Sequence, residues 1–304
     1  MPNGKEYHEL NYQDNSLHYR EFSAGSKNEA QARTWLDPDT VDAWRHRRMY
    51  CALDPLLETE SSTWLTIGDG RYGKDSRYIS EKGGDVLATD IDDTLLNEAR
   101  EIGFISKFRK ENAESLSFGD AAFDFVFCKE SYHHFPRPML ALYEMLRVAS
   151  RGVVLIEPND QYIGYSVSRN IFIHLISRLL SLVHKRIPLH SFEEFGNYVY
   201  TISRRELEKT ALGMNYRYLA FKGVNDSYEH GVEFEKVAEN GRLLKKLKLK
   251  IFLRDLLSKL RVIDYGMLVA IIFKQSPSEA LLKRLTHEGF DVVELPENPH
   301  SHGR

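Results

Sequence analysis

Residues 63–73 read TWLTIGDGRYG, and this stretch decides the fold that we predict for the chain. The β-branched and apolar residues 63–67 predict a short strand that stops at Gly68. Residues 75–82 then fit a helix. Glycines at such a junction allow a tight turn and a close approach to a ligand, and a helix N-terminus offers backbone N–H groups. The stretch therefore predicts a strand, a ligand-binding turn and a helix.

An acid follows this unit at a distance typical of nucleotide-binding folds. Residues 85–89 predict a second strand that ends at Asp90, about twenty residues beyond the turn. In a doubly wound sheet this carboxylate lies beside the first turn and can accept hydrogen bonds from ribose hydroxyls. Gly68, Gly70, Gly73 and Asp90 are thus candidate cofactor contacts. The same features fit a nicotinamide-dependent oxidoreductase nearly as well.

The rest of the chain continues the alternation of strands and helices. Further strands are predicted at 123–128, 152–156, 216–222 and 267–274, and further helices at 40–58, 92–101, 139–148 and 203–214. This pattern predicts an α/β protein with a Rossmann-like, doubly wound, mostly parallel sheet of seven strands. We expect a helical cap at 1–60, a catalytic domain at 61–274 with helical insertions at 165–200 and 228–262, and a C-terminal extension at 275–304.

Composition narrows the class of protein. A hydrophobic fraction of 42 % supports a large core, and a net charge of -3 gives no reason to expect a nucleic-acid partner. The two cysteines, Cys51 and Cys128, lie far apart and fit neither a disulfide framework nor a metal site. The first residues lack a signal-peptide pattern, so we expect a cytoplasmic protein. Neither a metal nor an oligomeric state is predicted.

Five segments between residues 64 and 158 resemble, in order, the motifs of one family. They lie at 66–79, 112–118, 123–127, 132–135 and 144–148. These segments are similar to class I S-adenosylmethionine-dependent methyltransferases of the ubiquinone-biosynthesis type. The resemblance implies S-adenosyl-L-methionine as cofactor. It also implies cofactor contacts at Gly68, Gly70, Asp90, Asn112, Ala113 and Lys129.

Three positions depart from the family pattern. Thr66 stands where the family has an acid that helps to hold the methionine amino group, and we hypothesise that Asp69 takes this role. The third glycine, Gly73, comes one residue late. Asn112 replaces an aspartate that contacts the adenine amino group, although an amide oxygen can accept the same bond.

Candidate bases follow the fourth and fifth predicted strands. His133 and His134 follow the fourth strand, and Glu157 ends the fifth. A histidine suits proton removal from a hydroxyl near neutral pH. We rank His134 slightly first, because it matches the second histidine of the family motif. A structural role is the alternative for each of the three.

The whole pattern also resembles methyltransferases of bacterial surface-polysaccharide and secondary pathways. That resemblance implies a small-molecule or saccharide acceptor and O-methylation. Two alternatives stay open. A nicotinamide-dependent oxidoreductase would share the glycine turn, but the sequence lacks the Tyr-x-x-x-Lys pair after the fifth strand. A non-catalytic cofactor-binding or membrane-docking protein would account for the altered first motif.

Two basic segments, 171–187 and 242–261, have apolar residues at helical spacing. In the second segment these residues are Leu249, Leu253, Leu256, Leu257 and Leu260. A basic amphipathic helix can contact an anionic membrane weakly, or it can cap the sheet with its apolar stripe in the core. We favour the cap, because a surface helix of any globular protein shows such a stripe.

Overall fold

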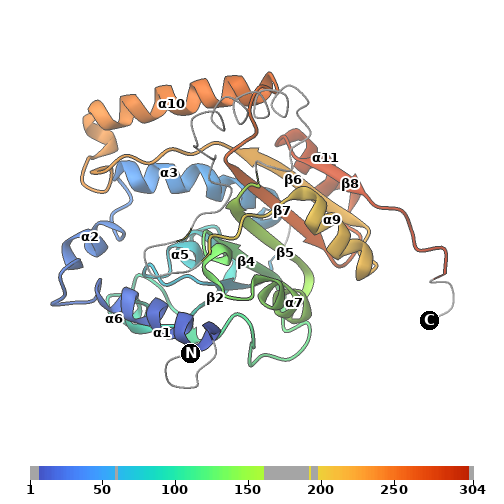
Figure 1. The fold of residues 1–304 in the computed structure, drawn as a ribbon, viewed down its shortest axis with the longest axis horizontal. Helices are drawn as coiled ribbons and strands as arrows, with labels where there is room; N and C mark the ends of the chain where they lie inside the picture. Colours follow the sequence, from blue (N-terminus) through green and yellow to red (C-terminus); the bar gives the residue numbers. More distant parts are fainter. Residues whose placement is uncertain (1–6, 59–60, 161–191, 193–197, 301–304) are drawn as a thin grey trace, which may run out of the picture.

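The structure, a computed structural model, describes residues 7–58, 61–160, 192 and 198–300. One eight-stranded sheet runs through the molecule in the order β3-β2-β1-β4-β5-β7-β6-β8 (Figure 1). The strands are β1 (Thr63–Ile67), β2 (Asp85–Asp90), β3 (Phe108–Lys110), β4 (Phe123–Lys129), β5 (Ala149–Pro158), β6 (Tyr218–Val224), β7 (Met267–Phe273) and β8 (Asp291–Glu294).

The first five strands are parallel, and β7 pairs antiparallel with both β5 and β6. The predicted Rossmann-like α/β class is therefore confirmed. The described residues hold eight strands instead of seven, because β8 pairs with β6 and adds an edge strand to the sheet. The short edge strand β3 was also not predicted. Its three residues are too few to show a period of two.

Helices cover both faces of the sheet. The helices and 3₁₀ turns are α1 (Tyr7–Arg20), α2 (Glu29–Thr34), α3 (Val41–Tyr50), η2 (Cys51–Leu53), α4 (Asp54–Leu57), α5 (Lys74–Glu81), α6 (Thr94–Glu101), η3 (Tyr132–His134), α7 (Pro138–Val148), α9 (Arg204–Gly213), η4 (Val237–Glu239), α10 (Arg242–Lys259) and α11 (Glu279–His287).

Each face of the sheet has its own hydrophobic core. Leu65 and Ile67 of β1 pack with α7 and α9 on one face, whereas Trp64 packs with α3, α4, α5 and α11 on the other. All three side chains are buried, as a central strand covered on both faces requires. Trp64 stacks on Phe125 of β4 at a centroid distance of 4.8 Å.

The helix predicted at 40–58 consists of α3, η2 and α4. Pro55 explains the interruption, because it has no N–H to donate to the residue four positions earlier, and the preceding turn tightens to 3₁₀ geometry. At the start of α9, the Ser203 side chain caps the helix by accepting a hydrogen bond from the backbone N–H of Glu206.

Two helical regions differ from the predictions. Residues 7–20 show no apolar period but form α1, which lies beside α6 (Figure 1). In α10 the predicted stripe of five leucines is exposed, and the buried side chains are Leu244, Leu247, Ile251 and Ser258. The interpretation of that stripe as a core contact is wrong. The basic segment 171–187 lies outside the described residues.

The register of the sheet determines which residues meet at the C-terminal ends of its parallel strands. Ile67 is level with Thr89 of β2 and with Cys128 of β4. The turn after β1 therefore begins beside Asp90 on one side and beside Lys129 on the other. None of the helices in the described part of the chain combines the length and the apolar character that crossing a bilayer requires.

Candidate functional site

The turn after β1 is held against the segment that follows β4. Gly68 has a φ of +73°, and a Cβ at this position would lie 2.4 Å from the Cβ of Ser131. The Ser131 hydroxyl donates a hydrogen bond to the carbonyl oxygen of Gly68 at 2.7 Å. Any larger residue would thus be strained in its backbone and would clash with Ser131. Gly73 also has a positive φ, and it is the N-cap residue of α5.

Asp69 caps α5 from within the turn. Its carboxylate accepts hydrogen bonds from the backbone N–H groups of Asp75 and Ser76, at 3.0 and 2.9 Å, and from the hydroxyl of Thr66 at 2.9 Å. Burial and the nearby Asp75 carboxylate raise the pKa of Asp69 to about 8, although the two backbone bonds oppose this shift. The predicted contact to a methionine amino group stays a prediction, and it competes with this capping role.

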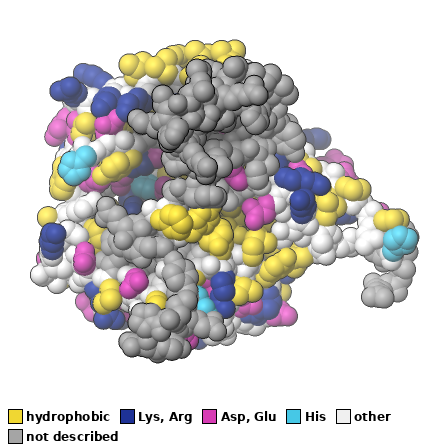
Figure 2. Space-filling model, viewed as in Figure 1, with side chains coloured by type: hydrophobic (Ala, Val, Ile, Leu, Met, Phe, Trp, Pro, Cys, Tyr) yellow, Lys and Arg dark blue, Asp and Glu magenta, His cyan; other side chains and the backbone are white. Residues whose placement is uncertain are grey.

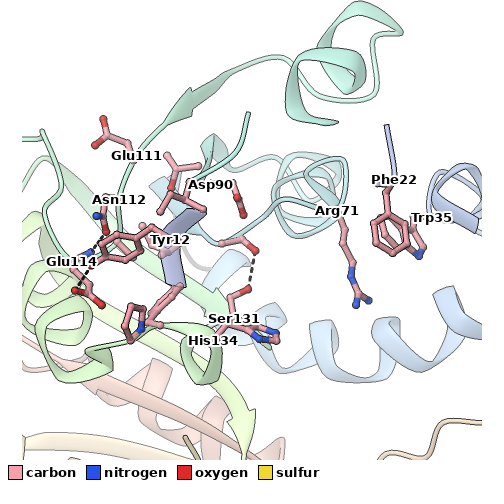
Figure 3. Close-up of a pocket in the computed structure, with 17 residues that line it drawn as sticks. Tyr12, Phe22, Trp35, Arg71, Asp90, Glu111, Asn112, Glu114, Ser131 and His134 are labelled. Carbon is pink, nitrogen blue, oxygen red and sulfur yellow. Dashed lines mark hydrogen bonds between the residues drawn. The ribbon is translucent and has the colours of Figure 1, made fainter. Parts of the chain in front are cut away.

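A cavity of about 260 Å³ opens beside the turn, and we call it the aromatic cavity (Figure 3). It is lined by Tyr12, Phe22, Trp35, Ile67, Gly68, Arg71, Thr89, Asp90, Ile91, Glu111, Asn112, Ala113, Glu114, Ser131, His134, Phe135 and Pro136. Its polar groups include a carboxylate at the end of β2 and a side-chain amide two residues after β3. A ribose and a purine ring need such groups, so the lining fits a nucleoside.

Asp90 is the ionisable group beside the turn in the aromatic cavity. It is 4 % exposed, and its carboxylate accepts a bond from the backbone N–H of Asp92 at 2.9 Å. Burial raises the pKa of Asp90 to about 7, against the hydrogen bonds from the N–H groups of Asp92, Gly70 and Ile91. Gly70 does not line the cavity itself, but its backbone N–H donates a hydrogen bond to Asp90, which does.

Asn112 and Ala113, two of the predicted cofactor contacts, line the same cavity. The side-chain oxygen of Asn112 accepts a bond from the backbone N–H of Glu114 at 2.9 Å. An amide oxygen has two lone pairs, so one remains for a ligand.

The N-terminal residues cover the aromatic cavity, and sequence reasoning did not place them there. Tyr12 of α1 donates to Glu114 at 2.5 Å, beside Asn112 (Figure 3). At the other end, Phe22 and Trp35 pack at a centroid distance of 5.0 Å, and the Arg71 guanidinium lies 5.0 Å from the Trp35 ring. Three scattered aromatic residues give no periodic signal, so only the tertiary structure shows this cover.

A second cavity, of about 250 Å³, shares Gly68, Arg71, Ser131 and His134 with the first. We call it the charged cavity. Its remaining lining residues are His46, Tyr50, Asp69, Lys74, Asp75, Lys129, Glu130 and His133. The two cavities therefore meet at the turn after β1.

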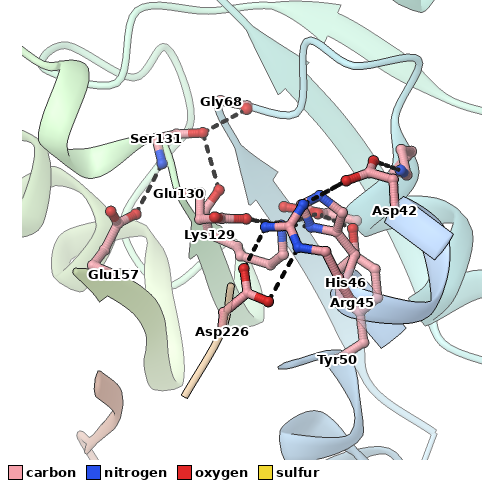
Figure 4. Close-up of polar contacts among 12 residues, drawn as sticks. Asp42, Arg45, His46, Tyr50, Gly68, Lys129, Glu130, Ser131, Glu157 and Asp226 are labelled. Carbon is pink, nitrogen blue, oxygen red and sulfur yellow. Dashed lines mark hydrogen bonds and ion pairs between the residues drawn. The ribbon is translucent and has the colours of Figure 1, made fainter. Parts of the chain in front are cut away.

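Ion pairs link α3 to the end of β4 in the charged cavity (Figure 4). Lys129 donates to Glu130 at 2.8 Å, and the Nδ1 atom of His46 lies 3.3 Å from the same carboxylate. Burial works against ionisation of Glu130, but Lys129 and His46 hold the pKa of this carboxyl well below its usual range. Lys129, a predicted cofactor contact, thus lines the charged cavity rather than the aromatic one.

A second set of charges lies deeper, on the first turns of α3. Asp42 accepts a bond from Arg45 at 2.6 Å, and the Nζ atom of Lys74 lies 3.7 Å from Asp42. Burial lowers the pKa of Lys74 to about 8, although Asp42 opposes the shift. Residues 42, 45 and 46 share one helix face through i, i+3 and i+4 spacing. That spacing is a signal that the sequence analysis did not use.

His133, which lines the charged cavity, forms an acid–base pair with Glu157 beneath it. The Nδ1 atom of His133 lies 2.7 Å from Oε2 of Glu157, which is fully buried. The other oxygen of Glu157 accepts bonds from the backbone N–H groups of Ser131 and Tyr132 at 2.9 and 3.0 Å. His134 lies beside His133, at a ring-centroid distance of 4.0 Å, and lines both cavities.

Within the described ranges, no cluster of three or more histidine, cysteine, aspartate or glutamate residues has the geometry to hold a metal ion. Most of the predicted site residues line one or both of the two cavities, whereas Gly70 and Gly73 line neither. Gly68, Asp90, Asn112, Ala113 and His134 line the aromatic cavity, whereas Asp69, Lys129 and His133 line the charged one. Glu157 lies beneath the charged cavity and reaches it through His133.

Residues 65–156 match the sequence model of a methyltransferase domain family. This segment contains the turn after β1, Asp90 and both histidines. Together with the strand order, the match identifies it as the core of a class I S-adenosylmethionine-dependent methyltransferase domain. The predicted class of enzyme and its cofactor are thereby confirmed, and the oxidoreductase alternative is set aside. No curated protein is similar enough in sequence to count as a match.

Several solved structures are similar to this chain at low identity. An S-adenosylmethionine-dependent methyltransferase from Methanosarcina mazei is 18 % identical, with a TM-score of 0.45 over 74 % of this chain and 98 % of that one. The magnesium protoporphyrin IX methyltransferase of Synechocystis PCC 6803, with bound S-adenosylhomocysteine, is 13 % identical, with a TM-score of 0.46 over 85 % and 99 %.

The [4+2]-cyclase SpnF is 15 % identical to this chain, with a TM-score of 0.48 over 76 % of this chain and 81 % of the cyclase. These values are too low to transfer a reaction or a substrate from any of the three structures.

Proposed function

We propose that this chain transfers a methyl group from S-adenosylmethionine to a hydroxyl of a small-molecule or saccharide acceptor, with His133 as the general base. The observation that carries the proposal is the contact between His133 and Glu157 at 2.7 Å, with Glu157 fully buried. A histidine held by a buried carboxylate is the arrangement that proteins use to take a proton from a hydroxyl.

The hydrogen bonds that Glu157 accepts favour a role of His133 as the base. Its second oxygen is occupied by two backbone N–H groups, of Ser131 and Tyr132, so the carboxylate has one orientation. That orientation fixes the His133 ring and stabilises the imidazolium that forms when the base accepts a proton. On this ground His133 ranks above His134, which the sequence pattern had placed first. His134 lines both cavities and is our candidate for aligning the acceptor.

The two cavities suggest a division of the ligands. We assign the nucleoside part of the cofactor to the aromatic cavity, with Asp90 on the ribose and Asn112 and Ala113 on the adenine. We assign the acceptor and the methionine end to the charged cavity, where Asp69 and Lys129 remain candidate contacts. When bound, the cofactor supplies an activated methyl group. The chain positions the acceptor oxygen, and His133 removes its proton as the new bond forms.

The proposal is tested by methyl transfer from labelled S-adenosylmethionine to a panel of sugars, phenols and alcohols, with amines and thiols in parallel. His133→Gln should lower kcat on the best hydroxyl acceptor by about 10³-fold, because general bases contribute 10²–10⁴-fold. Calorimetric titration should show unchanged binding of S-adenosylhomocysteine to the variant.

His134→Gln is the matched control and should lose less than tenfold in kcat, as expected of a residue that aligns but takes no proton. A wild-type kcat in His133→Gln would contradict the assignment of His133 as the base. Methyl transfer to amines or thiols alone would contradict the assignment of O-methylation. Binding of NAD without S-adenosylmethionine would contradict the cofactor itself.

A further inference from the structure

Helix α10 has two apolar faces, and within the described part of the chain only one of them packs on the protein. Leu244, Leu247 and Ile251 form a small core with Val41 of α3 and with Val232. At about 100° of rotation per residue, these three positions lie within roughly 60° of one another. The opposite side of the helix bears six large apolar residues: Leu249, Phe252, Leu253, Leu256, Leu257 and Leu260, with exposed fractions between 39 % and 64 %.

This exposed apolar face is continuous along the helix. Its six residues span three turns at i, i+3, i+4, i+7, i+8 and i+11 spacing, so their side chains are neighbours. Figure 2 shows hydrophobic side chains in a row along the edge of the molecule where α10 lies in Figure 1. Single exposed leucines are common in soluble proteins, but a contiguous patch of this kind marks an interaction surface.

Basic side chains flank the exposed apolar face on both sides. On the helical wheel Lys245 and Lys259 lie along one flank, and Lys246 and Lys250 along the other, where both form ion pairs with Glu229. All four are exposed. The acid of α10, Asp255, lies toward the protein, where it accepts a hydrogen bond from Asn225 at 2.9 Å. The outward side of α10 is thus apolar in the centre, and its net positive charge lies along the edge formed by Lys245 and Lys259.

We propose that α10 docks the protein on an anionic lipid surface, with the helix lying in the plane of the interface. Its apolar face would enter the boundary between headgroups and acyl chains, and its lysines would meet the phosphates. A second copy of the chain fits this surface less well, because pairing two such faces brings their basic flanks together. The proposal rests on α10 alone and is independent of the acceptor and of the catalytic base.

The first test is flotation of the full chain with two kinds of vesicle. One is phosphatidylcholine alone, and the other contains about one third phosphatidylglycerol, at low and high salt. We expect binding to the anionic vesicles that falls as salt rises. The double variant Phe252→Ser/Leu256→Ser should bind at least tenfold more weakly. Both side chains are exposed, so its circular dichroism and thermal unfolding should match the wild type.

Leu140→Ser/Tyr143→Ser on α7 is the matched apolar control, because these side chains are exposed to a similar degree and lie on another element. The charge reversal Lys245→Glu/Lys259→Glu should cost roughly tenfold on anionic vesicles and little on neutral ones. Lys283→Glu on α11, an exposed lysine outside the face, should retain binding.

Equal flotation of the wild type and the α10 variants would overturn the proposal, as would an absence of flotation. A dimer detected by light scattering and abolished by Phe252→Ser/Leu256→Ser would also overturn it, in favour of a second copy as the occupant.

Discussion

The two cavities that meet at Gly68 differ in how they are built. The aromatic cavity has Asp90 and Asn112 at its centre and ring side chains from the N-terminal residues as its cover. The charged cavity is a network of ion pairs among α3, the end of β4 and α5, with His133 and Glu157 at one side. The first is suited to hold a nucleoside by a few polar contacts and apolar burial. The second is suited to preorganise charge around a reacting group.

This difference predicts a separation of effects. Variants in the aromatic cavity should change the affinity for the cofactor, and variants around His133 should change the rate. A result that mixes the two would show that the cavities act as one site.

Apart from His133→Gln, the largest expected effect within this comparison concerns Asp90. Asp90→Ala removes the acceptor that we assign to both ribose hydroxyls, and bonds to a charged acceptor contribute about 1.5–3 kcal/mol each. We therefore expect about a hundredfold loss of affinity for S-adenosylhomocysteine by calorimetry. The control is Asp93→Ala, an acid three positions later whose ion-pair partner is Lys110. Equal losses in the two variants would refute the assignment.

The next effect concerns Glu157. In Glu157→Gln the amide oxygen can still accept from the backbone N–H groups of Ser131 and Tyr132, but an amide N–H then faces the Nδ1 atom of His133. That contact favours the wrong tautomer and removes the charge that stabilises the imidazolium. We expect kcat to fall about thirtyfold, with the affinity for S-adenosylhomocysteine unchanged. Retention of full kcat would make the pair a structural contact.

The smallest effect is a pH dependence of cofactor binding. The pKa of Asp90 is raised to about 7, so the carboxylate is ionised above that pH and protonated below it. Ribose hydroxyls donate hydrogen bonds to the ionised form, so affinity should be full above pH 8 and about tenfold weaker at pH 6.

Asp69 and Lys74 titrate near pH 8 and lie in the other cavity, so the control is Asp90→Asn. Calorimetry across this range should give a flat profile for Asp90→Asn. If the variant keeps the wild-type slope, the titrating group is in the charged cavity instead.

Local signals in the sequence were enough to predict β1, the turn, α5 and Asp90. The strand has four buried residues in a row after Thr63, the turn has glycine at two positions of positive φ, Gly68 and Gly73, and the acid follows at the distance set by one helix and one strand. These features depend on neighbours in the chain, so they can be read without the fold.

The cover of the aromatic cavity could not be predicted in the same way. Helix α1 has no apolar period, and its described contacts are tertiary: Tyr12 bonds to Glu114, and Ser16 bonds to Asp92. Likewise, His46 and Glu130 meet although they lie far apart in the chain. Such contacts depend on how the layers pack, which no local period records.

Periodicity thus predicts the α/β class and the glycine turn after β1, because short-range backbone geometry dictates them. The methyltransferase resemblance rests on five ordered sequence segments instead. Only the tertiary structure shows that the His133 side chain reaches Glu157, and this contact is why we propose His133 rather than His134 as the base. The tertiary structure also decides which apolar face of α10 packs inward. Two apolar stripes on one helix are equivalent in the sequence, and only the surface formed by Val41 and Val232 distinguishes them.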